Sequence, residues 1–469
     1  MYILVAGIFR NMRKIIPVPL IIFIFLLLFR GSAFSAATPE IRVGLTLTGN
    51  ALELSFDSGY EIINTASGTP LQLSPGRYKL VPTQGGVKFL DRQGNDCGVY
   101  KEPLYLRPQS TQPSDATFFM HNAVYGSEYR GALEITLAGG SLKAINVLDL
   151  ESYLRAVVPR EMPSSWGNYG GTEALKSQAV AARSYALFNL GARRHGGYHL
   201  CDDPLHCQYY GGKNAETNNT DSAVGQTRGE VLTYNGSLIE PHYCASNGGY
   251  TELPQNVWSS GLPYYQSVHD PYDDPSNPLK LSNFIVHPYS TWETSIPLKS
   301  LGSLLAAGGY GNPGEVKRIY IASKFDSGRV GELRVEGTNG SVSLFKQDAR
   351  FALGLRSQLF TVKEELEPCV WVASATGTIE TKNSFPELEG KWVAGGYTIK
   401  SMLTGERFAV VGDGVKGEVP TLGYVLTGRG SGHAIGMSQN GAYNRSRAGH
   451  SYLDILSFYY PGTDVSAVY

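Results

Sequence analysis

The segment GTEALKSQAVAARSYALFNLGA, residues 171–192, is the clearest helix signal in the chain. Its apolar residues recur at roughly helical spacing, at Leu175, Val180, Ala182 and Leu187. The region before it instead alternates apolar and polar residues between glycine-containing turns, which is typical of short antiparallel strands. We therefore expect an α+β fold in which a strand-rich scaffold carries one dominant helix, at about 172–190, beside the loops that hold the chemistry.

The length and charge of the chain limit its class. It has 469 residues, enough for roughly two or three domains with a substantial core. Its formal net charge is −1, so we expect no nucleic-acid partner, because a phosphate-binding surface normally brings an excess of basic residues. The patterns predict five segments: a signal or anchor (1–37), a strand-rich N-terminal region (38–128), a core with the catalytic and metal motifs (129–275), a mixed α/β segment (276–365) and a C-terminal part (366–469).

The N-terminus has the layout of an export signal. Arg10, Arg13 and Lys14 precede the apolar run IIPVPLIIFIFLLLF, and small residues follow in GSAFSAATPE. This order of a basic region, an apolar region and small residues is that of a secretory signal peptide. The apolar run is short for a spanning helix, although an uncleaved anchor remains open. We expect an exported protein of the periplasm or cell envelope that meets a membrane only through this segment if it is not removed.

The stretch RHGGYHLCDDPLHCQYYGG, residues 194–212, gathers histidines and cysteines that are scarce elsewhere. Cys201, His206 and Cys207 lie close together along one loop, and His195 or His199 could supply a fourth ligand. Zinc binds such nitrogen and sulfur atoms in tetrahedral sets. The spacing is not that of a zinc finger, so the motif predicts a zinc site less strongly than a finger motif would.

Two other interpretations of these cysteines stay open. A Cys201–Cys207 disulfide suits an exported chain, and the separation of six residues is compatible with disulfide geometry. A cysteine nucleophile beside a histidine, Cys207 with His206 or Cys244 with His242, is less favoured. Neighbouring residues on a strand point to opposite faces, so a base rarely activates the residue next to it.

A single glutamate is the candidate acid. Glu161 lies between Pro159 and Pro163 in VVPREMPSSWGN, which predicts a fixed loop. Burial in this apolar loop would raise the pKa of the carboxyl, as a general acid requires near neutral pH. On the predicted helix, Lys176 and Arg183 are seven residues apart and could line a groove for a polar or anionic substrate. The plain alternative is a surface glutamate beside a solvated helix face.

A glycine-rich stretch near the C-terminus, GRGSGHAIGMSQNGA at residues 428–442, surrounds His433 and Gln439. Glycine permits close backbone approach and positive φ, so the stretch suits either a binding loop or a packing turn. It lacks the Gly-Lys-Ser/Thr ending of a phosphate-binding loop. Two helices with Gly449 between them are expected to follow.

Several ordered motifs resemble the stage II sporulation protein D family, which includes the amidase enhancer LytB. The matching stretches are NVLDLESYLRAVVPREMP, EALKSQAVAARSYAL, CDDPLHCQYYGG with TRGEVLTYNG, SNGGYTE, VWSSGLPYYQSVHDP, SGRVGELRVEGTNG, GRGSGHAIGMSQNGA and SYLDILSFYYPGT. The resemblance covers about residues 130–465. It implies a peptidoglycan lytic transglycosylase that cleaves MurNAc–GlcNAc bonds of peptide-free glycan strands and leaves 1,6-anhydro ends.

The resemblance also implies roles for particular residues. Glu161 matches the essential glutamate of the family, and Lys176 and Arg183 match its helix lysine and arginine. His195, Cys201, His206 and Cys207 match a structural zinc site of some members, which favours zinc over a disulfide and His195 over His199. In the other matching loops we expect substrate-binding residues at Ser246, Tyr264, Asp270 and His433.

Two competing functions remain at this stage. The chain could be a non-catalytic wall-binding protein that enhances a separate N-acetylmuramoyl amidase, as the amidase-enhancer members suggest. It could also hydrolyse an amide through zinc, which needs only three protein ligands and a water. Glycan strands are the expected partner of a transglycosylase, and an enhancer would in addition bind a cell-wall amidase.

Overall fold

The computed structural model describes residues 37–469, except for the internal stretches 110–115, 193–194, 259, 277–289, 367–369, 374–378, 383–407, 412–414 and 419–420. Of the predicted signal or anchor, only residue 37 belongs to the described part. Among the helices formed by the described residues, none combines the length and the apolar character that crossing a membrane requires.

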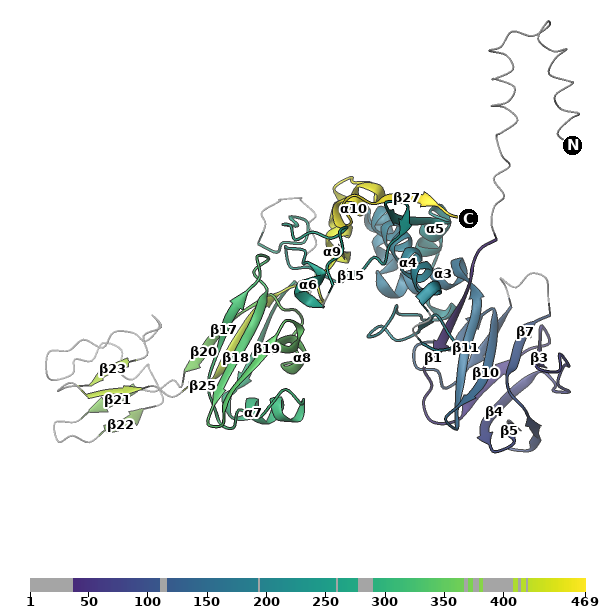
Figure 1. Cartoon of the computed structure of the whole chain (residues 1–469), viewed down its shortest axis with the longest axis horizontal. Coiled ribbons are helices and arrows are strands. Elements are labelled where there is room, and N and C mark those ends of the chain that lie inside the picture. Colours follow the sequence, from purple (N-terminus) through teal and green to yellow (C-terminus); the bar gives the residue numbers. More distant parts are fainter. Residues whose placement is uncertain are drawn as a thin grey trace, which may run out of the picture.

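Two six-stranded sheets form the N-terminal part of the molecule (Figure 1). In spatial order, the first sheet consists of β12 (Leu200–Cys201), β1 (Glu40–Leu45), β11 (Ser141–Asp149), β10 (Ala132–Ala138), β7 (Leu104–Pro108) and β3 (Tyr60–Asn64). The second consists of β6 (Asp96–Tyr100), β5 (Gly86–Asp91), β4 (Gly76–Thr83), β2 (Leu52–Phe56), β8 (Thr117–Met120) and β9 (Glu128–Arg130). Their alternate apolar side chains share one core, as the alternating sequence pattern predicted.

The first sheet crosses the domain boundary that the sequence suggested at residue 129. β1 pairs with β11 over its whole length, from Glu40 opposite Asp149 to Leu45 opposite Ala144, and β7 pairs with β10. The separation of 38–128 from 129–275 is therefore wrong. Hydrogen bonding between strands distant in sequence joins both segments into one unit, and local patterning carries no signal of such pairing.

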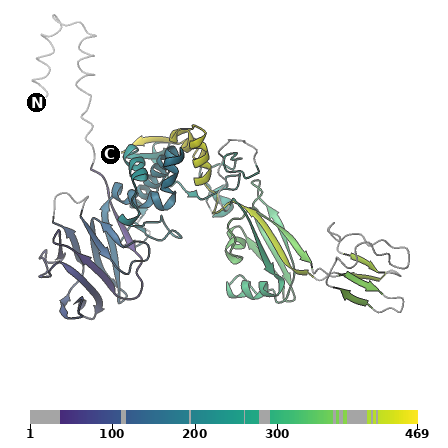
Figure 2. The same cartoon turned by 180° about the vertical axis from the view of Figure 1, so that it is seen from behind.

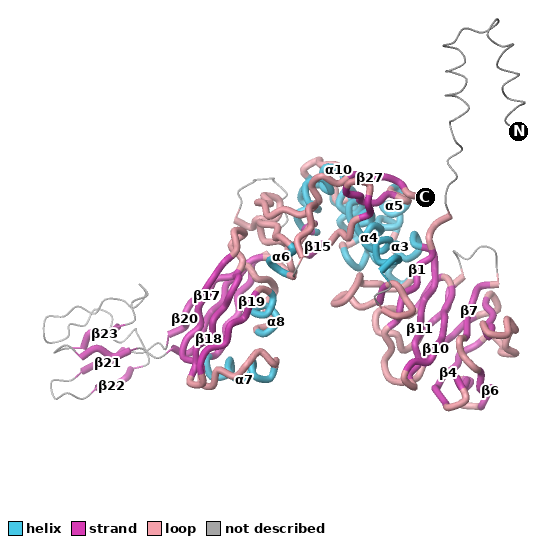
Figure 3. Tube along the Cα trace, in the orientation of Figure 1, coloured by secondary structure: helices cyan, strands magenta, loops and turns pink. Residues whose placement is uncertain are grey.

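The helices gather beside this sheet pair around α4, as the tube view shows (Figure 3). They are α3 (Leu150–Glu161), η1 (Ser164–Tyr169), α4 (Thr172–Ala192), η2 (Lys213–Ala215), α5 (Asn218–Gln226), α9 (Gln439–Arg447) and α10 (Tyr452–Tyr459). The short helix α6 (Pro254–Val257) lies apart from this group. The predicted helix at about 172–190 and the predicted helix pair around Gly449 are confirmed. α4 is buried on most of its surface, and its alanines allow α3, α5, α9 and α10 to pack against it. The strand-rich α+β class is thus confirmed.

A separate domain is inserted into the core between α6 and α9, and its elements form their own hydrophobic core. They are β16 (Thr291–Pro297), α7 (Leu298–Ala307), β17 (Val316–Lys324), β18 (Val330–Gly337), β19 (Gly340–Phe345), α8 (Gln347–Ala352), β20 (Phe360–Leu366) and β25 (Thr421–Arg429). The hairpins β21 (Val370–Ala373) with β22 (Ile379–Lys382), and β23 (Phe408–Val411) with β24 (Val415–Glu418), extend from its far end (Figure 2). We call residues 291–429 the inserted domain.

After the inserted domain the chain returns to the core. The short strands involved are β13 (Glu230–Tyr234), β14 (Ser237–Leu238), β15 (Tyr243–Cys244), β26 (Met437–Ser438) and β27 (Asp464–Ala467). β26 pairs with β15 and β27 pairs with β13, whereas β25 pairs with β16 and β20 of the inserted domain. The predicted division at 365/366 is therefore wrong, because the segment 366–469 contributes to both bodies.

Candidate functional site

Glu161 is the last residue of α3 rather than part of a loop. Pro159 lies inside the last turn of this helix, and Met162 adopts extended angles, φ −126° and ψ 137°. Proline disfavours the helical conformation in the residue before it, so Pro163 ends the helix at Glu161. The prediction of a proline-framed loop was wrong in its local structure. It was right that this sequence holds Glu161 at a defined place, here the carboxyl end of a packed helix.

The Glu161 carboxyl is partly buried and held by donors from three distant segments. Its Oε1 accepts a hydrogen bond from the backbone N–H of Tyr209 at 2.9 Å, and its Oε2 lies 3.4 Å from Nε2 of Gln439. The phenol of Tyr243 also hydrogen-bonds to it. Burial raises the pKa of Glu161 to about 7, although these three hydrogen bonds act in the opposite direction. The group is therefore close to half protonated at neutral pH.

Gln208 orients the groups around Glu161. Its Nε2 donates to the Tyr243 hydroxyl at 2.9 Å and to the Ala182 carbonyl at 3.3 Å, and its Oε1 accepts from the Tyr153 hydroxyl at 3.1 Å. Gln208 is 2% exposed, so its hydrogen bonds are shielded from solvent and fix the positions of the groups that they join. Sequence reasoning missed Gln208, Tyr209 and Tyr243. The one available signal was the polar run CQYYGG directly after the predicted metal ligands.

A second acid with a raised pKa shows that the shift alone does not identify the site. Burial raises the pKa of Asp273 too, but this residue is 1% exposed. Its carboxylate accepts hydrogen bonds from Ser246 Oγ at 3.0 Å, Ser438 Oγ at 2.7 Å and Asn440 Nδ2 at 2.8 Å. It joins the loop after β15 to the start of α9. Only Glu161 combines the raised pKa with residual exposure in this pair, so we take it as the candidate acid.

Lys176 keeps part of its surface open, with 17% of its side chain exposed. Its Nζ lies 2.8 Å from Glu173 Oε1 and 5.7 Å from the ring centre of Tyr452. Glu173 also accepts a hydrogen bond from the backbone of Tyr452, at the start of α10. The predicted substrate contact at Lys176 stays a prediction, since an ammonium group in this position is accessible but already paired.

Arg183 does not line a groove, and the expectation of a direct substrate contact there is wrong. The side chain is 0% exposed and forms a two-pronged ion pair with Glu151 of α3, at 2.8 and 2.9 Å. It also donates to the carbonyls of Val224 and Glu230, at 3.2 and 3.1 Å. Arg183 therefore ties α3, α4, α5 and β13 together. Helical spacing placed it on a face with Lys176, but could not show that α3 covers its end of that face.

Three further expected substrate contacts are also buried. Ser246 is 1% exposed and donates to Asp273, and Asp270 is 0% exposed. Asp270 accepts hydrogen bonds from Tyr459 at 2.6 Å and from Arg445 at 2.9 Å, so it anchors α9 and α10. Tyr264 is 7% exposed within the core around these helices. All three predictions of direct contact are wrong, because other parts of the folded chain bury these side chains.

His433 remains partly exposed in the glycine-rich loop before α9. Its ring lies 5.2 Å from that of Trp258 and 6.2 Å from that of His242. Burial, followed by the charges of His242 and Arg350, lowers the pKa of His433 to about 3. The loop itself needs glycine, because a Cβ at Gly436 (φ 69°) would approach the His242 carbonyl oxygen to 2.1 Å. His433 is thus a neutral aromatic group in the glycine-rich loop before α9.

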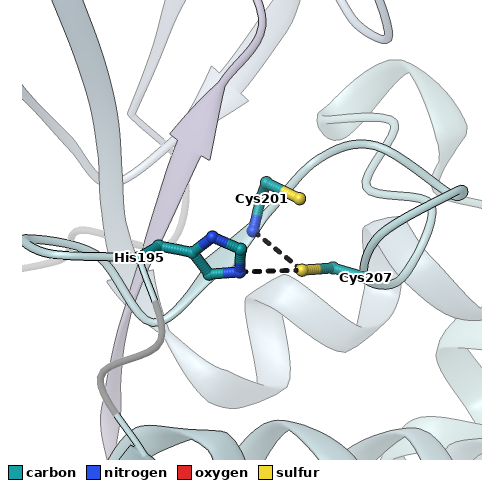
Figure 4. Close-up of side chains that lie close together, drawn as sticks. All are labelled: His195, Cys201 and Cys207. Atoms are coloured by element: carbon teal, nitrogen blue, oxygen red, sulfur yellow. Dashed lines mark hydrogen bonds between the residues drawn. The ribbon is translucent and has the colours of Figure 1, made fainter.

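The predicted metal ligands partly converge. Figure 4 shows His195, Cys201 and Cys207 turned toward one another, and one ligand atom of each lies within 4.8 Å of the others. Cys207 Sγ is 3.3 Å from His195 Nε2. Pairing of β12 with β1 places Cys201, and a turn in which the Cys207 N–H donates to the Asp203 carbonyl places Cys207. Two sulfurs and one imidazole at these separations suit the bond lengths of tetrahedral zinc.

His206 and His199 do not join this group. The imidazole of His206 is 70% exposed, and its Nδ1 lies 2.9 Å from Asp203 Oδ2. His199 Nδ1 instead accepts the backbone N–H of Arg42 at 3.0 Å. Because Asp203 holds the His206 ring at the surface, the structure does not place the fourth predicted ligand on the other three.

The sulfur atoms of Cys201 and Cys207 lie within 4.8 Å of each other. Cys201 and Cys207 are not joined as a disulfide; the backbone N–H of Cys201 donates to Cys207 Sγ at 3.3 Å. The side-chain hydrogen bond with Cys207 lowers the pKa of the Cys201 thiol. Burial raises the pKa of Cys244 to about 12, which suppresses the thiolate that a nucleophile needs.

Comparisons with known proteins agree with the family resemblance. The family model described as "SpoIID: Stage II sporulation protein" matches residues 138–234, which include Glu161 and the metal-ligand group. The chain is 33% identical over 330 residues to the amidase enhancer of Bacillus subtilis (strain 168), and 26% identical over 339 residues to stage II sporulation protein D of the same strain. It is 27% identical over 371 residues to an uncharacterized protein of Brachyspira hyodysenteriae.

The coverage of these relatives differs. The alignments take in 67%, 69% and 79% of this chain, for the amidase enhancer, the sporulation protein and the Brachyspira protein respectively. The chain spans only 40% of the amidase enhancer, but 76% and 78% of the other two. The chain therefore carries a domain of the SpoIID family at residues 138–234.

Proposed function

We propose that this protein is a peptidoglycan lytic transglycosylase with Glu161 as its acid and base. The observation that carries the proposal is a partly exposed carboxyl whose pKa burial raises to about 7. No charged side chain contributes to this shift among the described residues. The proposed reaction needs only this one carboxyl, whereas ordinary glycoside hydrolases use a pair.

One carboxyl suffices for an intramolecular transfer. Protonated Glu161 donates its proton to the oxygen that links MurNAc to GlcNAc, and the bond from C1 of MurNAc to that oxygen breaks. The carboxylate then accepts the proton of the C6 hydroxyl of MurNAc as this oxygen bonds to C1. The products are a free GlcNAc hydroxyl and a 1,6-anhydro MurNAc end, without consumption of water.

The contacts of Glu161 suit both halves of this cycle. The donors from Tyr209, Tyr243 and Gln439 stabilise the carboxylate formed after the first proton transfer, while burial favours the acid before it. The direct test is mass spectrometry of peptide-free glycan strands digested by the protein. Anhydro ends support the proposal, and reducing ends would reject the mechanism.

We expect the activity to decline as the pH rises through about 7. Only the protonated form of Glu161 can donate a proton, and this form predominates below its pKa and is lost above it. Above pH 7, kcat/KM should fall about tenfold per pH unit, as for loss of a single essential acid. The measurement is initial anhydro-product formation between pH 5 and 9. A rate that stays level to pH 9 would contradict the assignment.

A second candidate function is that of a wall-binding enhancer of a cell-wall amidase. The name of the relative at 33% identity favours it, although the chain spans less than half of that protein. Binding of glycan strands without any anhydro product, with stimulation of an added N-acetylmuramoyl amidase, would select this alternative. The export signal predicted from the N-terminal sequence would suit either function.

We propose that His195, Cys201 and Cys207 hold a structural zinc ion. The distances among their ligand atoms support it, as does the direct continuation of this loop into Gln208 and Tyr209, which position Glu161. Bound zinc would cross-link this loop through the three side chains and so stabilise the segment that carries Gln208 and Tyr209.

Removal of the proposed zinc should unfold the loop and lower thermal stability. We expect Cys201→Ser to lose bound zinc by elemental analysis, to reduce Tm by several degrees and to lower activity together with the fold. His206→Ala tests the fourth position: loss of zinc makes His206 a ligand, and retained zinc leaves that position to water. Chelation that stops amide hydrolysis while Tm stays unchanged would instead support a catalytic zinc.

A further inference from the structure

Trp258, directly after α6, is a large exposed aromatic side chain at the rim of the core. It keeps 42% of its surface open to solvent. The centre of its ring lies 4.7 Å from the ring centre of His242 and 5.2 Å from that of His433. Tyr265 stacks on His242 from another direction, at 6.1 Å. These rings form an aromatic cluster with one open indole.

The inserted domain holds Trp258 in this position. Lys346, between β19 and α8, donates from its Nζ to the backbone carbonyls of Gln255 and Trp258, both at 2.7 Å. These bonds cap the carboxyl end of α6, where carbonyl groups lack partners within the helix. The ammonium group thus fixes the backbone that carries the indole, although the lysine belongs to another body of the fold.

The aromatic cluster is connected to Glu161 through Tyr243. His242 precedes Tyr243 in the chain, and the His433 ring hydrogen-bonds to the backbone of Tyr243, whose phenol bonds to Glu161. Tyr185 of α4 lies 6.2 Å from His242, ring centre to ring centre. The glycine-rich loop that carries His433 continues into Gln439, which also contacts Glu161. The cluster and the carboxyl therefore share their supporting residues.

We propose that Trp258, with His242 and His433, forms a stacking subsite for a sugar ring of the peptide-free glycan strand cleaved at Glu161, and that Lys346 is a positioning residue for Trp258. The subsite rests on the proposed function, because it takes the same substrate at a neighbouring sugar.

The chemistry of the cluster favours a sugar over a charged ligand. The face of an indole carries partial negative charge, which attracts the slightly positive C–H groups on one side of a pyranose ring. The low pKa of His433 keeps this imidazole neutral at working pH, so it adds no charge to the subsite. A few polar groups beside an aromatic surface are typical of sites that bind small neutral units.

The experiment measures the affinity of the full chain for purified peptide-free glycan strands, with Glu161→Gln as the background so that nothing is cleaved. We expect Trp258→Ala to weaken binding about tenfold and Trp258→Phe to retain most of it. Phe119→Ala is the matched control. Phe119 is 41% exposed and also stacks on a histidine, His121, but it lies on β8 of the N-terminal sheets.

The role of Lys346 is tested by a double substitution. Lys346→Met should weaken glycan binding several-fold in the parent and have little effect in the Trp258→Ala protein, because both changes remove one interaction. Equal effects in the two backgrounds would overturn the positioning role. Unchanged binding by Trp258→Ala, an equal loss in Phe119→Ala, or a loss confined to peptide-bearing wall would overturn the subsite. Absence of anhydro product from the wild type would reject the proposed transglycosylase activity, while the binding results would still decide whether Trp258 forms a glycan subsite.

Discussion

Glu161→Gln should reduce the release of anhydro ends from peptide-free glycan strands by about a thousandfold, within the range that general acid–base catalysis contributes. Glutamine keeps the shape of the side chain and can still accept the hydrogen bond from Tyr209, so the fold should persist. It cannot donate the proton that the leaving oxygen needs. The measurement is single-turnover product formation followed by mass spectrometry, with Tm as the check on folding.

The matched control for this substitution is Glu134→Gln. Glu134 is on β10 and pairs with Arg42 at 2.9 Å, with 20% of its side chain exposed. Such partly exposed ion pairs contribute little to stability, so turnover should equal that of the wild type. An active Glu161→Gln protein would reject Glu161 as the acid, whereas a wild type that binds glycan strands without releasing anhydro ends would favour the enhancer function.

Arg183→Met should destabilise the protein strongly without the signature of a lost substrate contact. Breaking a buried, hydrogen-bonded ion pair by removing one partner costs about 3–5 kcal/mol, because the other charge stays buried. Here the partner left behind is Glu151, which also accepts a hydrogen bond from Tyr469. We therefore expect the free energy of unfolding in urea to fall by about this amount.

A second substitution separates the two possible roles of Arg183. Combining Arg183→Met with Glu151→Gln removes both charges and should recover part of the lost stability, since no uncompensated carboxylate remains. If glycan affinity instead drops while the unfolding free energy is unchanged, Arg183 contacts substrate and the structural role is wrong. Lys176→Met is the useful comparison, because Lys176 is partly exposed and should affect stability less.

The success and failure of the residue predictions follow one physical rule. Several features that depend on neighbours in sequence were found correctly: the α4 helix, the alternating strands and the closeness of three of the four predicted metal ligands, His195, Cys201 and Cys207. The predicted loop at Glu161 was wrong, because this residue ends a helix, and His206 lies apart from the other three. Features that depend on what covers a side chain were not found correctly. The sequence predicted that Arg183 and Asp270 contact substrate, but helices from other parts of the chain bury both side chains.

The domain boundaries failed for a related reason. Patterns of composition suggested domain boundaries at residues 129 and 366. Strand β1 pairs with β11 across the first boundary. The segment after the second boundary contributes β25 to the inserted domain and β26 to the core. Strand pairing is satisfied by backbone groups, which every residue carries, so the partner of a strand leaves little trace in local sequence.

By itself, the sequence determined which chemical groups are present and in what order: a glutamate between two prolines, two cysteines and three histidines in one stretch, and an alanine-rich helix. Tertiary structure alone decided the surroundings that raise the pKa of this glutamate. Gln439 reaches it from 278 residues away, and the donors at Tyr209 and Tyr243 arrive from two further segments. A pKa reports the loss of water around a group, and only the folded chain brings together the atoms that displace that water.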